Sequence, residues 1–103
     1  MDRSTINAQA AHLLNQFIQK DLQMSIRAFA KLVGVAESSL RYFLANNSGS
    51  AGRQRHSRGP YASTLRPILE LCIPDALRES LLDVIYYEER VAARKLGLHG
   101  AQR

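Results

Sequence analysis

The sequence predicts an all-α protein: a compact domain of five helices with a long C-terminal helix and one flexible basic loop. Apolar residues recur three and four positions apart along most of the chain, the spacing that places them on one face of a helix. No stretch shows the strict alternation of apolar and polar residues that is typical of a strand. The chain has 103 residues, 46% of them hydrophobic, which suits a single modest core. We therefore expect residues 1–103 to form one domain.

The first expected helix covers residues 7–23. Its apolar residues would share one face, and they are Ala10, Leu13, Leu14, Phe17, Ile18 and Leu22. Ser4, Thr5 or Asn7 could cap its start through a side-chain oxygen. Ser25 is placed to cap the helix that follows in the same way.

Residues 26–45 are expected to form two short helices joined by a turn, one over residues 26–33 and one over about 37–45. The apolar rhythm breaks only at Gly34, which can take the positive φ that a tight turn requires. The small Ala30 would let the two helices cross closely. This pattern is typical of a helix-turn-helix, whose second helix lies in the DNA major groove. An ordinary pair of packed helices joined at a glycine remains the alternative.

Residues 46–60 are expected to form a basic surface loop. The segment has three glycines and no large apolar residue, so it cannot bury itself, and it is long for a connection within a compact domain. Arg53, Arg55 and Arg58 are spaced as in a flexible segment that follows a phosphate backbone or enters a minor groove. A solvated loop whose charge is incidental is an equal alternative.

A short apolar helix through Leu65 and Cys72 is expected next, capped by Ser63 or Thr64. Pro67 is tolerable there because it would lie in the first turn. Cys72 is expected to be a buried small hydrophobe rather than a reactive thiol.

The last helix is expected over residues 74–96, where a proline and an acid open it and a glycine follows it. At roughly 30 Å it is longer than a core of this size needs. Its second half is therefore the predicted site of dimer contacts, through Ile85, Val91, Ala92 and Leu96. The alternative is that this half packs back on its own domain.

The charge of the chain is concentrated in one part of the sequence. The net charge is +5, and residues 1–66 carry nine Lys or Arg against three acids, whereas residues 67–103 carry five against six. A basic half attracts polyanions and releases their counterions on binding, which favours a nucleic-acid partner. Simple solubility is the alternative explanation.

Several classes of protein are disfavoured. The three His residues lie in separate segments without Cys, Asp or Glu at ligand spacing, so no metal site or cofactor is expected. No phosphate-binding glycine loop or nucleophile elbow is present, and we predict no enzyme. No membrane span, signal peptide or small-molecule pocket is expected either. The single Cys72 fits a reducing cytoplasm.

Residues 26–44 resemble the helix-turn-helix of the Cro and phage-repressor family, also called XRE-type regulators. In that family a small alanine precedes a turn glycine and a valine, which here are Ala30, Gly34 and Val35. Over residues 10–82 a weaker resemblance implies the five-helix Cro/repressor-like fold.

Three features depart from the pattern of that family. Many members carry a Gln that contacts phosphate where this chain has Ile26, and the neighbouring Arg27 could supply a contact instead. The second helix opens after Ala36, a poor cap, where Ser or Thr is common. The basic loop is longer than the usual connection, which suggests an added DNA contact.

The outward positions of the second helix are the predicted reading residues. Arg41 can form bidentate hydrogen bonds with a guanine, and Glu37 can accept from a cytosine amino group. Tyr42 could contact a thymine methyl group, or pack at the edge of the core. The residues predicted to contact bases are Glu37, Ser38, Arg41 and Tyr42. Those predicted to contact the DNA backbone are Arg27, Ser39, Asn46, Asn47, Arg53, Arg55 and Arg58, the two asparagines alternatively serving as helix caps.

Together these features predict a sequence-specific, double-stranded DNA-binding transcriptional regulator in the cytoplasm, associated with the nucleoid when bound to DNA. We expect a homodimeric repressor that reads a palindromic operator through the major groove, of a kind common on phages and plasmids. Two alternatives remain: a DNA-bending recombination or partition accessory protein, and an antitoxin-like protein-interaction module.

Overall fold

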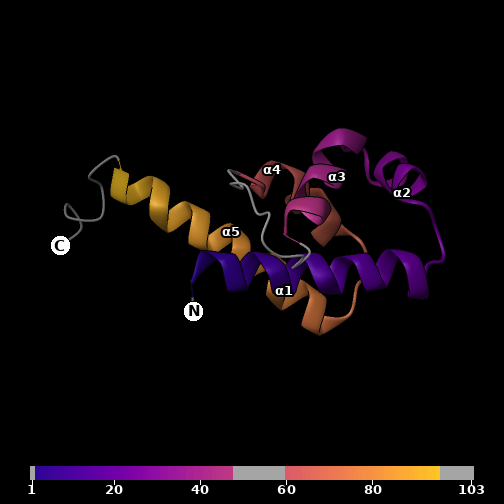
Figure 1. Cartoon of the computed structure of the whole chain (residues 1–103), viewed down its shortest axis with the longest axis horizontal. Helices are drawn as coiled ribbons and strands as arrows, with labels where there is room; N and C mark the ends of the chain where they lie inside the picture. The colour runs from indigo at the N-terminus through magenta and orange to yellow at the C-terminus, as the bar shows by residue number, and fades with distance from the viewer. Residues whose placement is uncertain (1, 48–59, 96–103) are drawn as a thin grey trace.

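The computed structural model describes residues 2–47 and 60–95. Within these ranges the protein consists of helices and connections without a strand, so the predicted all-α class with five α-helices is confirmed. The elements are α1 (Arg3–Gln16), the π-helix η1 (Phe17–Asp21), α2 (Ile26–Val33), α3 (Glu37–Asn46), α4 (Ala62–Leu65), the 3-10 helix η2 (Arg66–Glu70) and α5 (Asp75–Lys95). In Figure 1, α1 and α5 cross near the middle of the molecule, while α2, α3 and α4 gather on one side of α1.

Helix α1 begins at Arg3, because Asp2 caps it: the Asp2 Oδ1 accepts from the Thr5 N–H at 3.0 Å. The expected start at residue 7 and the expected caps at Ser4, Thr5 or Asn7 are therefore wrong. Asn7 lies inside the helix with only 3% of its surface exposed. Aspartate is among the best N-cap residues, and its signal precedes the apolar face from which the helix was recognised.

Helices α2 and α3 follow the predicted pattern closely. The Ser25 Oγ accepts from the Ala28 N–H at 3.0 Å and so caps α2. Gly34 has φ of +88°, and the N–H groups of Gly34 and Val35 both donate to the Ala30 carbonyl, at 2.8 and 3.0 Å. Ala36 precedes α3 in an extended conformation and supplies no side-chain cap, as its residue type predicts.

The second half of the chain departs further from expectation. Neither Ser63 nor Thr64 caps α4, which begins at Ala62, and Thr64 is instead buried within it. Pro67 lies in the first turn of η2, as expected. Cys72 is exposed, which corrects the prediction of a buried residue. The helical spacing that would have turned it inward ends at Glu70, where η2 gives way to an extended connection.

The core lies where α1 and α5 meet α2, α3 and α4. Phe17 of η1 and Phe29 of α2 pack edge to face, with ring centroids 6.4 Å apart. The largest fully buried side chains are Phe29, Phe43, Leu14, Ile18, Leu40, Leu65, Ile68, Leu77, Leu81, Ile85 and Val84. Burial of each such side chain contributes roughly 1.5–3 kcal/mol of transfer free energy. The fully buried residues of α5 lie in its first half, so its later turns extend past the core.

Across the two described ranges, none of the helices combines the length and apolar character that crossing a membrane demands.

Candidate nucleic-acid interface

Helix α3 has one buried and one exposed face, as predicted. Leu40 and Phe43 are fully buried and Leu44 is 7% exposed, so these three side chains fix α3 against the core. The opposite face exposes Ser38, Ser39, Arg41, Tyr42 and Ala45, with Glu37 half-buried at the start of the helix. This exposed face, made of polar, charged and small side chains, is called the α3 face below.

Glu37 and Arg41 form an ion pair along the α3 face. The Arg41 Nε donates to the Glu37 Oε2 at 2.8 Å, and a terminal guanidinium nitrogen lies 2.6 Å from the same oxygen. The two residues stand one turn apart, the spacing at which side chains of opposite charge meet on a helix. More than half of the Arg41 side chain is exposed, and such a surface pair contributes only about 0.3–0.5 kcal/mol. Arg41 can therefore leave Glu37 for a partner that it binds more strongly, at little cost in free energy.

Tyr42 packs at the edge of the core, one of the two roles predicted for it, and its side chain is also partly exposed. Its side chain is among the large exposed hydrophobic groups, at 46%, yet its ring lies 6.3 Å from that of Tyr61. Tyr61 is itself buried, and its ring packs edge to face on Phe43 at 4.8 Å. The cluster of Tyr42, Phe43 and Tyr61 thus joins the α3 face to the start of α4.

Glu88 of α5 holds Tyr61 in place. The Tyr61 N–H donates to both carboxylate oxygens, at 2.9 and 2.8 Å, and the Ala62 N–H donates to the Glu88 Oε1 at 3.0 Å. A carboxylate at a helix start satisfies N–H groups that have no partner within the helix. This role of Glu88 was not predicted from the sequence. No local pattern in the sequence could link Glu88 to Tyr61 and Ala62, which lie 27 and 26 positions earlier.

The residues predicted to contact the DNA backbone divide into three groups. Arg27 and Ser39 are exposed, on the first turn of α2 and on α3 respectively. Asn47 is buried, and its Nδ2 donates to the Phe43 carbonyl at 2.8 Å. It therefore caps the end of α3, and its prediction as a phosphate contact is wrong. The side chain of Asn46 and all of Arg53, Arg55 and Arg58 lie outside the described residues.

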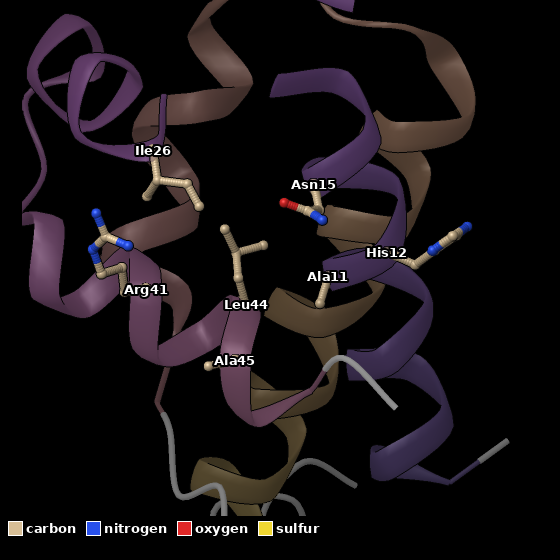
Figure 2. A pocket seen from close by; sticks show the side chains of 7 residues that line it. All are labelled: Ala11, His12, Asn15, Ile26, Arg41, Leu44 and Ala45. Carbon is tan, nitrogen blue, oxygen red and sulfur yellow. The ribbon is translucent and has the colours of Figure 1, made fainter. Parts of the chain in front are cut away.

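A cleft of about 330 Å³ adjoins the α3 face, between α3, α1 and the start of α2. Figure 2 shows Arg41 and Asn15 on opposite sides of this cleft, with Leu44 between them and His12 turned away. Ala11, Ile26 and Ala45 complete its walls. Asn15 of α1 also accepts from the Nε2 of Gln19, in η1, at 3.1 Å.

Over residues 2–47 and 60–95, no group of three or more His, Cys, Asp or Glu side chains is placed to hold a metal ion. Comparison with protein-family models, curated proteins and solved structures found no match to this chain.

The residues predicted to form dimer contacts lie in different environments. Ile85 is fully buried in the core of its own chain and has no surface left for a partner. Its prediction as a dimer contact is therefore wrong. Val91 is half-buried and Ala92 is exposed on the later turns of α5. Leu96 lies outside the described residues.

Proposed function

We propose that this chain is a sequence-specific double-stranded DNA-binding regulator that places α3 in the major groove as the second helix of a helix-turn-helix. The observation that carries the proposal is the joint geometry of α2 and α3. Residues 34–36 connect the two short helices through the positive φ of Gly34, and Ala30, 2% exposed, lies where they pack. The resemblance of residues 26–44 to Cro and phage-repressor regulators supports the same function.

The dimensions of α3 suit the proposed groove. A helix of ten residues is about 15 Å long and, with its side chains, about 10–12 Å wide. The major groove of B-DNA is about 12 Å wide and admits a helix of this diameter. Because the apolar side of α3 is buried, the α3 face is the side that would meet the bases.

The Glu37–Arg41 pair is proposed to read bases by exchange. A good bidentate contact between arginine and guanine gives about 1–3 kcal/mol of discrimination, against about 0.3–0.5 kcal/mol for the exposed ion pair. Arg41 therefore gains by leaving Glu37 for a guanine at the right position. At a wrong base the pair stays closed, so Glu37 favours specificity over affinity.

The remaining contacts are proposed to fix the position of α3 on the duplex. Arg27 and Ser39 are exposed on α2 and α3 and would contact phosphates, which orient a protein without reading sequence. Ser38 and Tyr42 would contact base edges beside Arg41. Arg53, Arg55 and Arg58 would add sequence-independent affinity.

We further propose that the protein acts as a homodimeric repressor on a palindromic operator in the cytoplasm, and that its role is binding rather than catalysis. One module of this size buries too little DNA surface for tight specific binding, and a two-fold dimer doubles it. The two-fold symmetry of the protein would then be matched by the symmetry of its site.

The proposal is tested by selecting bound sequences from a random DNA pool and measuring two arginine variants on the winning site. Arg41→Ala should lower the ratio of specific to random affinity by roughly tenfold to a hundredfold. Arg66→Ala is the matched control, because Arg66 is equally exposed and is also paired with a glutamate, Glu89. That variant should leave the ratio unchanged.

Three outcomes would count against the proposal. If the selection enriches no DNA sequence, the protein is not sequence-specific. A measured bend in the bound DNA would then favour a DNA-bending accessory role. No affinity for any DNA at low salt would favour a protein-interaction module. Equal loss of specificity in Arg41→Ala and Arg66→Ala would remove the reading role of the α3 face.

A further inference from the structure

The second half of α5 leaves the core and borders a groove. In Figure 1 this end of α5 runs beyond the other helices, past the start of α1. Five of its residues line a groove of about 590 Å³ together with Arg3 and Pro60, and they are Tyr87, Glu88, Val91, Ala92 and Lys95. Glu88 and Val91 continue, at spacings of four and seven residues, the side of α5 that buries Val84. Glu88 on this side caps the start of α4. Val91 continues the same side one turn later, beyond the fully buried residues of α5.

Along the side of α5 that lines the groove, an acidic residue, two apolar residues and a basic residue follow one another at even spacing. Tyr87 and Glu88 lie at one end and Lys95 at the other, with Glu88 and Lys95 about 10 Å apart along the helix axis. The apolar Val91 and Ala92 lie at the midpoint between them. Ala92 is small enough for another helix to approach closely.

We propose that the groove binds a second copy of this chain, with the two segments of residues 88–95 antiparallel about a two-fold axis. The axis would pass beside Val91 and Ala92, which would pack on the same residues of the other copy. Glu88 would then face Lys95 of the partner subunit, and Lys95 would face Glu88 of the partner subunit. This inference deepens the proposed function, on which its meaning for operator binding rests.

Self-complementarity is what favours a second copy as the occupant. A two-fold interface uses the same patch on both partners, so every group must meet its own complement when the chain direction is reversed. The order of acid, apolar pair and base meets this condition, whereas a parallel arrangement would place Glu88 against Glu88. Glu88 can serve both purposes, since a carboxylate accepts about four hydrogen bonds and the Tyr61 and Ala62 N–H groups use only part of that capacity.

The extent of the pairing segment sets the expected affinity. Residues 88–95 form about two helical turns, which is small beside the roughly 800 Å² per partner of a standard stable interface. We therefore expect a dimer that dissociates in the micromolar range in the absence of DNA.

Sedimentation equilibrium of the full chain without DNA tests the pairing, independently of any operator. The wild type should change from monomer to dimer across the micromolar range. Lys95→Glu should weaken the dimer at least tenfold, because a glutamate would then face Glu88 of the partner subunit. Arg94→Glu is the matched control, since it changes the charge equally at the next position but does not line the groove. Lys95 and Arg94 are both exposed, so neither change should affect folding.

Cysteine cross-linking tests the geometry. In a Cys72→Ser background, Ala92→Cys should form a disulfide-linked dimer on mild oxidation, because the axis brings the two copies of this position together. Tyr86→Cys is the control, since Tyr86 is 51% exposed on the opposite side of α5 and should cross-link far less.

A monomer at every concentration would overturn the inference. So would an Ala92→Cys thiol that stays protected at concentrations where the protein is monomeric, because the groove would then be covered within one chain. Equal weakening by Arg94→Glu and Lys95→Glu, or equal cross-linking at positions 86 and 92, would overturn it as well. Each of these results leaves the specificity measured for Arg41 untouched, so failure of the dimer is distinguishable from failure of DNA binding.

Discussion

Ala36 occupies the capping position of α3 without the side chain that the position favours. Its backbone is already extended, with φ of −69° and ψ of +132°, as in a capped helix. Ser25 shows the effect of a proper cap one helix earlier, where its Oγ accepts from the Ala28 N–H. A resident alanine therefore leaves an N–H of the first turn of α3 without this side-chain partner.

Ala36→Ser should raise the free energy of unfolding by about 1 kcal/mol, because the new hydroxyl can accept from a first-turn N–H of α3. Ser25→Ala should lower it by a similar amount and serves as the reciprocal control. Urea denaturation followed by circular dichroism measures both. No gain in Ala36→Ser would mean that the start of α3 cannot accommodate the cap geometry.

Asp2 gives the start of α1 a dependence on pH. Hydrogen bonds from the Thr5 side chain and then the Thr5 backbone lower the pKa of Asp2 below its ordinary value of 3.8. A carboxyl whose pKa is lower in the folded state stabilises that state at pH above its unfolded pKa, and this contribution is lost as the pH falls through the lower folded pKa.

The amide of Thr5 should therefore lose protection from hydrogen exchange as the pH falls below 3.8. Asp2→Asn retains a capping oxygen but does not titrate, so its Thr5 amide should show a much smaller loss over the same range. Identical behaviour of the two proteins would exclude Asp2 as the titrating group.

At the scale of the elements, α4 depends on α5 for its first turn. Helix α4 spans only Ala62–Leu65 and has no cap of its own, and Glu88 supplies the acceptor from α5. The same carboxylate fixes Tyr61, whose ring packs on Phe43 of α3. One side chain thus joins three helices.

Glu88→Gln should lower the free energy of unfolding by about 1.5–3 kcal/mol, because it removes a charged acceptor from the Tyr61 and Ala62 N–H groups. The adjacent Glu89→Gln is the matched control. Glu89 pairs with Arg66 in an exposed position, and its loss should cost less than about 1 kcal/mol. Thermal and urea unfolding measure both variants, and equal effects would contradict the capping role of Glu88.

The elements that the sequence predicted well are those whose signals are local. Ser25 and Gly34 fix the start and end of α2 within a few residues, so both ends were predicted and are confirmed. The start of α1 was missed because its cap, Asp2, precedes the apolar pattern. The Glu88 cap joins residues far apart in the sequence, and the exposure of Cys72 depends on where η2 ends, so no local pattern could predict either.

The candidate site divides in the same way. The exposure of Ser38, Ser39 and Arg41 follows from helical periodicity and was predicted. The pairing of Arg41 with Glu37 depends on side-chain rotamers, which a sequence pattern does not determine. Asn47 and Ile85 are both buried. The hydrogen bond of Asn47 to the Phe43 carbonyl is local and agrees with the capping role given as its alternative. How far the core extends along α5, and so the burial of Ile85, depends on the packing of the whole domain.

At the scale of the whole molecule, one core unites the two ends of the chain. Helices α1 and α5 pack against each other, and Leu14 and Leu81 are both fully buried. Because neither helix keeps its apolar face covered without the other, α1 and α5 should unfold together. Small single domains with one core commonly unfold in a single transition.

Thermal unfolding should therefore show one transition, with the same midpoint by far-UV circular dichroism and by tyrosine fluorescence. Leu81→Ala should lower that midpoint for both probes alike, with a loss of about 2–5 kcal/mol in stability. Tyr86→Ala, on the exposed side of α5, should leave it nearly unchanged. Separate midpoints for the two probes would show that the domain does not unfold in a single transition.

The exposed position of Cys72 has a practical consequence. It is the only cysteine of the chain, and it lies in the connection between η2 and α5. A nitroxide attached to it would place a single paramagnetic reporter on each molecule without an engineered cysteine. Pulsed electron resonance between two such reporters would measure an intermolecular spacing directly, in solution and on DNA, with the native helices intact.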